Sequence, residues 1–273
     1  MLCVFVPVVI FSNTPALPIS IAICAVVSIY EMLKCMGVEK KLIIAIPAYV
    51  AAAVFPILTR YASSGAVTAS VCIAAIAVYL VITFAAVIWS HGKYSFSQGL
   101  SVFAICTYII SAYCGIIYVR DFETGAGYIF LLIFIGAWIT DVFAYFTGML
   151  FGKHKLIPDV SPKKTIEGSI GGIVFCTLSF VGYGILADVV FKDYISLTFL
   201  LVSGVVASLV SQIGDLIMSV IKRHYGIKDY GKIFPGHGGM LDRFDSVLLV
   251  SLCMFAICLI ARAFGFEVVI PLT

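Results

Sequence analysis

Long apolar runs separated by short polar stretches make up most of the chain. Most runs have the roughly 17–25 residues that a helix needs to cross a hydrocarbon core of ~30 Å. Their approximate bounds are 2–12, 17–37, 42–60, 66–90, 98–119, 126–151, 169–191, 195–223 and 240–266. Because the runs are continuously apolar rather than alternating, they favour helices over a membrane β-barrel. The pattern predicts an all-α polytopic membrane protein with about nine transmembrane helices, the first of them short.

Composition and charge place this protein in a membrane and give it an orientation. The mean hydropathy is +1.15, and only 11% of the residues are charged, which excludes a water-soluble globule. If the loops are numbered from a cytoplasmic N-terminus, 13 of the 17 Lys and Arg residues fall on the cytoplasmic side. The positive-inside rule then predicts that the C-terminus lies outside. The net charge of +3 reflects this topology, and no nucleic-acid partner is expected.

Polar residues gather in the second half of the chain. Only two acidic residues precede Asp121, namely Glu31 and Glu39. Glu31 lies inside an apolar run, and we interpret it as a structural partner of Lys34, three residues further on. The sequence predicts a region of N-terminal scaffold helices over 1–125. A catalytic region is predicted over 126–273, with cytoplasmic loops at 152–168 and 224–239 that are rich in Lys, Gly and Pro.

Three carboxylates are predicted to share one depth at the cytoplasmic interface. Asp215 lies in the predicted helix 195–223, where an unpaired carboxylate costs on the order of 3 kcal/mol and so needs a cation. Asp242 and Asp245 lie three residues apart in the first turn of the last predicted helix. Alone, such acids are ordinary partners of the helix dipole. Together with Asp215 they form a set of hard oxygen ligands suited to Mg²⁺.

Basic residues and glycines around these acids suggest phosphate binding. Lys222, Arg223, Lys228 and Arg243 supply positive charge for phosphate groups. The N–H groups of Gly238-Gly239, just before a helix, are expected to be open to an anion. Carboxylate-bound metal beside basic residues is typical of phosphoryl or nucleotidyl transfer.

The loop 152–168 gives a weaker signal. Gly152-Lys153 is not a P-loop, because the upstream glycine and the following Ser or Thr are missing. The run from Ser161 to Gly168 is a weak phosphate-binding candidate, and Asp141 lies deeper, in the sixth predicted helix. His237, between Pro235-Gly236 and Gly238, is expected to donate hydrogen bonds rather than to act as a base.

The residues of the C-terminal half resemble a known family. The motif combines Ser219-Val220-Ile221-Lys222-Arg223, Gly226-Ile227-Lys228-Asp229, Pro235-Gly236-His237-Gly238-Gly239 and Asp242-Arg243-Phe244-Asp245-Ser246. It closely resembles that of the phosphatidate cytidylyltransferase (CDP-diacylglycerol synthase) family. Asp141, Phe151-Gly152-Lys153 and Ser161-Pro162-Lys163-Lys164-Thr165 look like a second stretch of that family. The chain departs from the family at Ile166, where an aromatic residue is frequent, and in its short opening helix.

The resemblance implies an activity, cofactors and partners. Phosphatidic acid would attack the α-phosphorus of CTP, giving CDP-diacylglycerol and pyrophosphate at the cytoplasmic face of the cell membrane. Mg²⁺, a second cation such as K⁺ and a homodimer are implied as well. The metal would be bound by Asp215, Asp242 and Asp245, which with Lys222 and Arg223 would form the catalytic set. Substrates would contact Asp141, Ser161, Lys163, Lys164, Thr165, Ser219, Lys228, Asp229, His237, Gly238, Gly239 and Arg243.

Two other functions remain as alternatives. A CTP-dependent polyprenol or phytol kinase would transfer the γ-phosphoryl group to an alcohol, but it would need a base for a neutral hydroxyl. An ion-coupled transporter would also use intramembrane carboxylates. Transporters usually show paired halves and helices broken at the midplane, whereas here the polar residues gather in one half and on one side.

Overall fold

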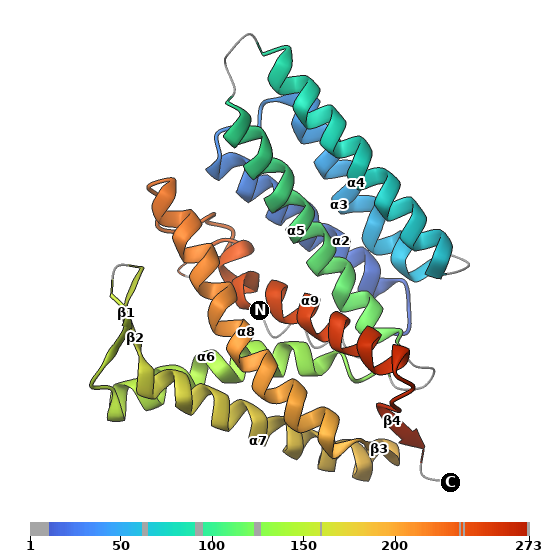
Figure 1. The fold of residues 1–273 in the computed structure, drawn as a ribbon, viewed down its shortest axis with the longest axis vertical. Coiled ribbons are helices and arrows are strands. Elements are labelled where there is room, and N and C mark those ends of the chain that lie inside the picture. The colour runs from blue at the N-terminus through green and yellow to red at the C-terminus, as the bar shows by residue number, and fades with distance from the viewer. Residues whose placement is uncertain are drawn as a thin grey trace. The chain divides into compact units, whose positions relative to one another are not determined.

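The chain is almost wholly helical in the computed structural model, which describes residues 11–61, 65–90, 95–122, 127–158, 160–234, 236 and 238–271. The helices are α2 (Ala16–Cys35), α3 (Leu42–Tyr61), α4 (Gly65–Ile88), α5 (Phe96–Arg120), α6 (Leu131–Phe151), α7 (Ile166–Phe191), α8 (Leu197–His224) and α9 (Leu241–Ala263) (Figure 1). Each is long and apolar enough to cross a membrane. The predicted all-α class is therefore confirmed, and these eight helices fit a polytopic membrane protein. Most of the predicted first span, 2–12, lies outside the described residues.

Two short antiparallel strand pairs lie in the segments outside the helices. Strand β1 (Lys155–Ile157) pairs with β2 (Ser161–Thr165), and β3 (Asp193–Ile195) pairs with β4 (Val269–Pro271). The first pair forms the loop between α6 and α7. The second pair joins the segment after α7 to the segment after α9.

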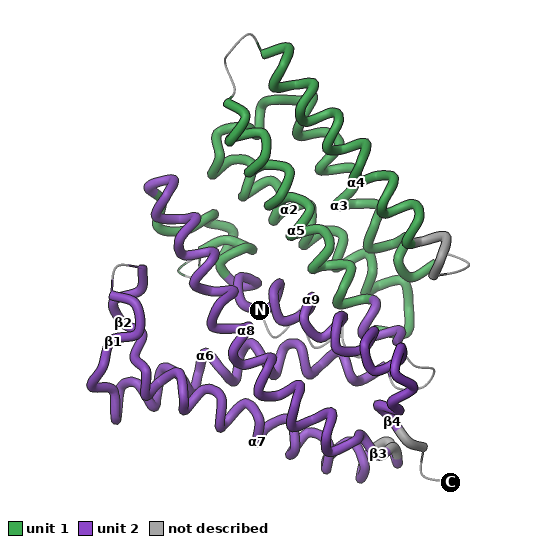
Figure 2. Tube along the Cα trace, viewed as in Figure 1, with its two compact units in different colours: residues 1–117, 227–242 green, residues 118–226, 243–273 purple. Residues whose placement is uncertain are grey.

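The chain divides into two compact units (Figure 2). Unit 1 comprises residues 1–117 and 227–242, and unit 2 comprises 118–226 and 243–273. The segment that follows α8 therefore belongs with the N-terminal helices, although it is far from them in sequence. The functional division predicted near residue 125 stays a prediction.

In unit 1, neighbouring helices are held together by small buried residues and by a buried hydrogen bond. Helix α3 packs against both α2 and α4. Ala45, Ala48 and Ala52 of α3 are fully buried, and small side chains let membrane helices approach closely. A 2.7 Å hydrogen bond between the hydroxyls of Ser28 and Tyr113 joins α2 to α5. Since both residues are buried, this bond satisfies two polar groups that would otherwise destabilise the interior.

Unit 2 is built around the mutual packing of α6, α7 and α8. Gly136 on α6 packs against several helices at once: a Cβ atom there would lie 3.1 Å from Ala207 and 3.4 Å from both Phe180 and Val250. These neighbours come from α8, α7 and α9, so all four helices meet at this glycine. On the outside of α7, Leu178 and Val189 are exposed, as expected of side chains that face lipid.

Candidate active site

The start of helix α7 is fixed by a side-chain cap and by close packing against α6. The Thr165 hydroxyl accepts the Gly168 N–H at 3.1 Å, which satisfies one of the free donors of the first turn. A Cβ atom at Gly148 of α6 would lie 2.7 Å from that same hydroxyl oxygen. The absence of a side chain at Gly148 therefore allows strand β2 to lie against the end of α6.

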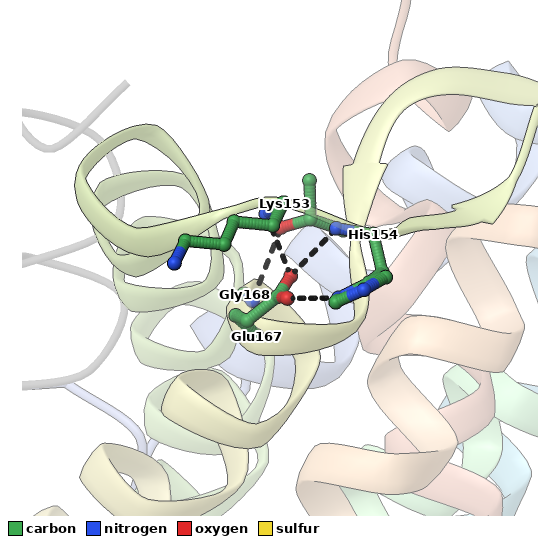
Figure 3. Close-up of polar contacts among 5 residues, drawn as sticks. Lys153, His154, Glu167 and Gly168 are labelled. Atoms are coloured by element: carbon green, nitrogen blue, oxygen red, sulfur yellow. Dashed lines mark hydrogen bonds and ion pairs between the residues drawn. The ribbon is translucent and has the colours of Figure 1, made fainter.

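Glu167, in the first turn of α7, holds the segment that follows α6. Its carboxylate accepts the backbone N–H groups of Lys153 at 3.1 Å and His154 at 3.3 Å (Figure 3). The ring nitrogen Nδ1 of His154 lies 2.7 Å from the other carboxylate oxygen. The Lys153 side chain extends away from this carboxylate, so its ammonium group is available to other anions (Figure 3). These N–H groups bind a protein carboxylate, which agrees with the exclusion of a P-loop.

Unit 2 brings three carboxylates together from three helices. Asp141 of α6, Asp215 of α8 and Asp245 of α9 each interact electrostatically with the other two. Asp215 and Asp245 are half-buried, while Asp141 is exposed. Like charges that approach one another inside a membrane protein need a cation or a proton to neutralise them. This group is the densest concentration of negative charge among the described residues of unit 2.

Lys164, at the end of β2, supplies one of the positive charges. Its Nζ lies 2.5 Å from Oδ2 of Asp215, and about a quarter of each side chain is exposed. The same ammonium donates to the backbone oxygen of Gln212, and the Gln212 amide donates to the backbone oxygen of Ser169 at 3.3 Å. The β1–β2 loop is thereby fastened to α8 next to the carboxylates.

Ser246 and two further basic residues complete the surroundings. The Ser246 hydroxyl donates to Asp141 at 3.2 Å, and its N–H donates to Oδ1 of Asp245 at 2.9 Å. Arg243 interacts electrostatically with Asp141, and Lys222 does so with Asp245. The buried Nε of Arg243 has no hydrogen-bond partner within the described part of the chain. A buried donor without a partner is costly unless a ligand satisfies it.

Asp242, the third predicted metal ligand, belongs to unit 1 and binds backbone groups there. Its Oδ2 accepts the N–H groups of Tyr230 at 2.8 Å and Gly239 at 2.9 Å. Gly238 has a φ of +81°, and a Cβ atom at that position would lie 2.9 Å from the same oxygen. A glycine therefore suits this turn for both its backbone conformation and its lack of a side chain. The Gly239 N–H, predicted to be open to an anion, is occupied by Asp242.

The remaining predicted site residues lie on strand β2, on helix α8 and in the segment that follows α8. In unit 2, Ser161 and Lys163 belong to β2, and Ser219, Lys222 and Arg223 lie in the last two turns of α8. Arg223 and Lys163 are exposed. In unit 1, Lys228 and Asp229 are exposed in the segment after α8. His237 lies outside the described residues.

The donors of unit 2 fit a hard divalent cation by their chemistry, because carboxylate oxygens are the preferred ligands of Mg²⁺. Across the ranges that the structure describes, however, no three His, Cys, Asp or Glu side chains converge closely enough to surround a single ion. Lys164 provides a protein cation beside Asp215. The identity of the metal ligands therefore stays a prediction.

Two acidic residues have partners that the sequence did not predict. Asp141 was assigned to substrate, but it lies with Asp215 and Asp245. Glu31 was paired with Lys34, but its carboxylate accepts the N–H groups of Met240 and Leu241 in unit 1. Both are acids inside apolar spans, which marks them as candidates for function or for a buried partner. Their partners are distant in sequence and could not be read from local spacing.

Comparisons with known proteins show which family the chain belongs to. A model described as the cytidylyltransferase family matches residues 1–261. A Staphylococcus haemolyticus protein named phosphatidate cytidylyltransferase is 34% identical over 253 residues, 91% of this chain and 92% of that protein. Proteins of the same name from Staphylococcus saprophyticus and Staphylococcus aureus (strain COL) are 44% and 45% identical over 165 residues, 59% of this chain and 59% of each relative. These matches confirm the resemblance drawn from the motifs. The chain belongs to the cytidylyltransferase family.

Proposed function

We propose that this protein transfers CMP from CTP to phosphatidic acid, giving CDP-diacylglycerol and pyrophosphate. The observation that carries the proposal is the group of Asp141, Asp215 and Asp245 with Lys164, Lys222 and Arg243 around it. Acids that can bind a metal and cations that can bind phosphate are what nucleotidyl transfer requires. The name of the relatives, phosphatidate cytidylyltransferase, supports the choice of substrates.

The reaction is a substitution at phosphorus. An oxygen of the lipid phosphate forms a bond to the α-phosphorus of CTP, and the bond from that phosphorus to the oxygen shared with the β-phosphate breaks. Pyrophosphate leaves with the bonding electrons. The attacking phosphate is already ionised at neutral pH, so no residue is required to remove a proton. The chain's task is to align two anions and to offset their charge.

Basic side chains of unit 2 suit that task. Arg243 has a buried Nε without a hydrogen-bond partner in the described structure and a guanidinium that suits a phosphate. Lys222 and the exposed Arg223 end α8 at the level where charged groups meet the membrane surface. Lys164 is placed to exchange its Asp215 partner for a substrate phosphate.

Mg²⁺ is the proposed cofactor, with Asp141, Asp215 and Asp245 of unit 2 as its proposed ligands; metal binding by Asp242 stays a prediction from the sequence. When bound, it would neutralise charge on the triphosphate and on the leaving pyrophosphate. The second cation, such as K⁺, and the homodimer remain predictions.

The proposed topology has nine spans, a cytoplasmic N-terminus and an outer C-terminus. Contacts within each unit support the assignment of loops to the outer side. The Arg60 guanidinium donates to the backbone oxygens of Ser12 and Asn13, and Arg262 donates to that of Phe122. Strands β3 and β4 pair the segments after α7 and α9. In every case the two partners are loops or helix ends that the charge pattern assigns to the same side.

The candidate site is proposed to face the cytoplasm and the inner leaflet of the cell membrane. CTP is a cytosolic polyanion, and the segments 152–168 and 224–239 carry much of the positive charge. Asp141 is exposed although it lies in the middle of α6, so the carboxylates of unit 2 are not sealed inside their own unit. An opening toward lipid would let a phosphate reach them while the acyl chains stay in hydrocarbon.

One labelling experiment separates the proposal from its alternatives. Purified protein in detergent is given phosphatidic acid, Mg²⁺ and CTP labelled in either the α- or the γ-phosphate. We expect the α-label in the lipid product and the γ-label in pyrophosphate. A γ-label transferred to an added polyprenol or phytol would indicate the kinase instead. If neither label moves in the presence of these acceptors, the proposed chemistry is wrong.

A further inference from the structure

Glu31 is a buried carboxylate whose partners lie about 210 residues away in the chain. Its side chain is 2% exposed, and its two oxygens accept the backbone N–H groups of Met240 at 3.0 Å and Leu241 at 2.9 Å. These N–H groups belong to the start of α9, where helices leave donors unsatisfied and favour negative charge. Glu31 therefore caps a helix that it does not belong to.

Two glycines make room for this carboxylate. A Cβ atom at Gly231 would lie 2.1 Å from Oε1 of Glu31, and one at Gly239 would lie 2.3 Å from it. Neither glycine has a positive φ, so the reason for glycine here is space rather than backbone conformation. The segment 227–242 is folded around the Glu31 side chain at both of its ends.

Three consecutive backbone N–H groups, those of residues 239–241, donate to the carboxylates of Asp242 and Glu31. Asp242 accepts the N–H of Gly239, and Glu31 accepts the next two. Asp242 also accepts the N–H of Tyr230, so the two carboxylates fasten the beginning and the end of the segment 227–242. Any shift of this segment past α2 would break the Glu31 bonds and move Asp242.

We infer that Glu31 is a positioning residue of the active site: from α2, it holds the segment 227–242 and the start of α9 so that Asp242 has one fixed place. The inference rests on the proposed function, because it assumes that this segment serves the transfer of CMP. Glu31 itself touches neither substrate. Glu31 also interacts electrostatically with Lys34, as predicted, and the Lys34 ammonium lies over the Tyr30 ring at 5.8 Å.

Hydrogen exchange tests the anchoring without any need for activity. The variants are Glu31→Gln, which keeps the length but only one acceptor oxygen, and Glu31→Ala, which keeps none. Glu39→Gln is the matched control, because it makes the same change in the loop after α2. Amides in peptides covering 227–245 should exchange roughly tenfold faster in Glu31→Gln, and faster still in Glu31→Ala, because charged acceptors are lost. Unchanged exchange in both variants would overturn the inference.

Kinetics test the positioning. Displacements of about 1 Å from the reacting geometry cost up to ~10²-fold in rate. We expect kcat to fall about 10- to 100-fold in Glu31→Gln, while KM for phosphatidic acid changes by about twofold or less, since Glu31 does not bind the lipid. Faster exchange with wild-type kcat would show that the anchor does not serve catalysis. If the wild-type protein transfers no CMP, the proposed function fails, and the exchange data still decide whether Glu31 anchors the segment.

A double substitution excludes a general loss of packing. Gly231→Ala places a methyl group where the Glu31 carboxylate lies, so it should raise exchange in the wild-type background. In the Glu31→Ala background that clash is gone, and the same substitution should raise exchange several-fold less. Equal effects in the two backgrounds would mean that Gly231 and Glu31 act independently, which contradicts the proposed contact. If Glu31→Ala weakens folding, the comparison can be repeated in Glu31→Asp, whose shorter side chain also withdraws the carboxylate from Gly231.

Discussion

Replacing Asp215 by Asn should separate catalysis from stability. Among the described residues, the Lys164 ammonium attracts Asp215 from 2.5 Å, and the carboxylates of Asp141 and Asp245 repel it. Asparagine keeps the shape of the side chain and removes the charge. The substitution therefore loses one favourable interaction and relieves two unfavourable ones at the same time.

The free-energy terms of Asp215→Asn largely offset each other. Exposed ion pairs stabilise a protein by about 0.2–1 kcal/mol, and on burial the stronger attraction is offset by the cost of desolvating both charges. With about a quarter of each side chain exposed, the Lys164–Asp215 pair contributes on the order of 1 kcal/mol. Relief of the repulsion from two carboxylates is of similar size and opposite sign. We expect the free energy of unfolding to change by about 1 kcal/mol or less, a shift in Tm of about 2–4 °C.

Activity should respond far more strongly than stability. If Asp215 helps to offset charge in the transition state, its loss should lower kcat by about 10²–10³-fold or more. The assay is pyrophosphate release by the purified variant, with Tm measured on the same sample. Asp188→Asn, the same change near the other end of the neighbouring helix α7, is the control and should leave both values near wild type. Near-normal turnover in Asp215→Asn would refute the reasoning, and so would a large loss of Tm without a matching loss of rate.

Three further changes test other contacts of the site. Lys164→Gln leaves Asp215 without its ion-pair partner, so Tm should fall in the absence of Mg²⁺ and recover when Mg²⁺ is added. The same Tm with and without Mg²⁺ would contradict this. Arg223→Lys should lower kcat/KM about 10-fold or more, because an ammonium cannot reproduce a planar guanidinium; steady-state kinetics that match wild type would make Arg223 a topological anchor only. Thr165→Ala removes the cap of α7 and should lower the free energy of unfolding by about 1 kcal/mol. Thermal unfolding measures this loss, with the same substitution at the exposed Thr198 of α8 as the control.

Hydropathy was sufficient to predict the described helices, because a spanning helix makes its backbone hydrogen bonds within itself. The predicted 42–60 and 195–223 differ from α3 and α8 by two residues or fewer at each end. The largest error is at the start of α6, predicted at 126 and observed at Leu131. Residues 127–130 are apolar enough to extend the run but form turns, and hydropathy does not register that difference.

The site could be predicted only where its residues are close in sequence. Asp242 and Asp245 share a helical turn, and Asp215 was identified because a carboxylate inside a membrane span needs a partner. The short strands and the Lys164–Asp215 pair depend on how the loop 152–168 folds back on α8, and no local pattern contains that information. Glu31 shows the same limit more clearly. Its spacing to Lys34 suggested only a local pair, but its carboxylate also accepts two backbone N–H groups at the start of α9, about 210 residues away.

The contacts of Glu31 and Asp242 also change how the glycine-rich segment is understood. Glycines before a helix often mark a backbone site for phosphate, because they expose N–H groups at the positive end of the helix dipole. Here the donors of Gly239, Met240 and Leu241 are bound to two carboxylates of the chain itself. Gly231 and Gly239 are small so that a carboxylate can fit beside them. In this arrangement we expect phosphate recognition to fall to the side chains of Lys and Arg, and the glycines to help hold Asp242 in place.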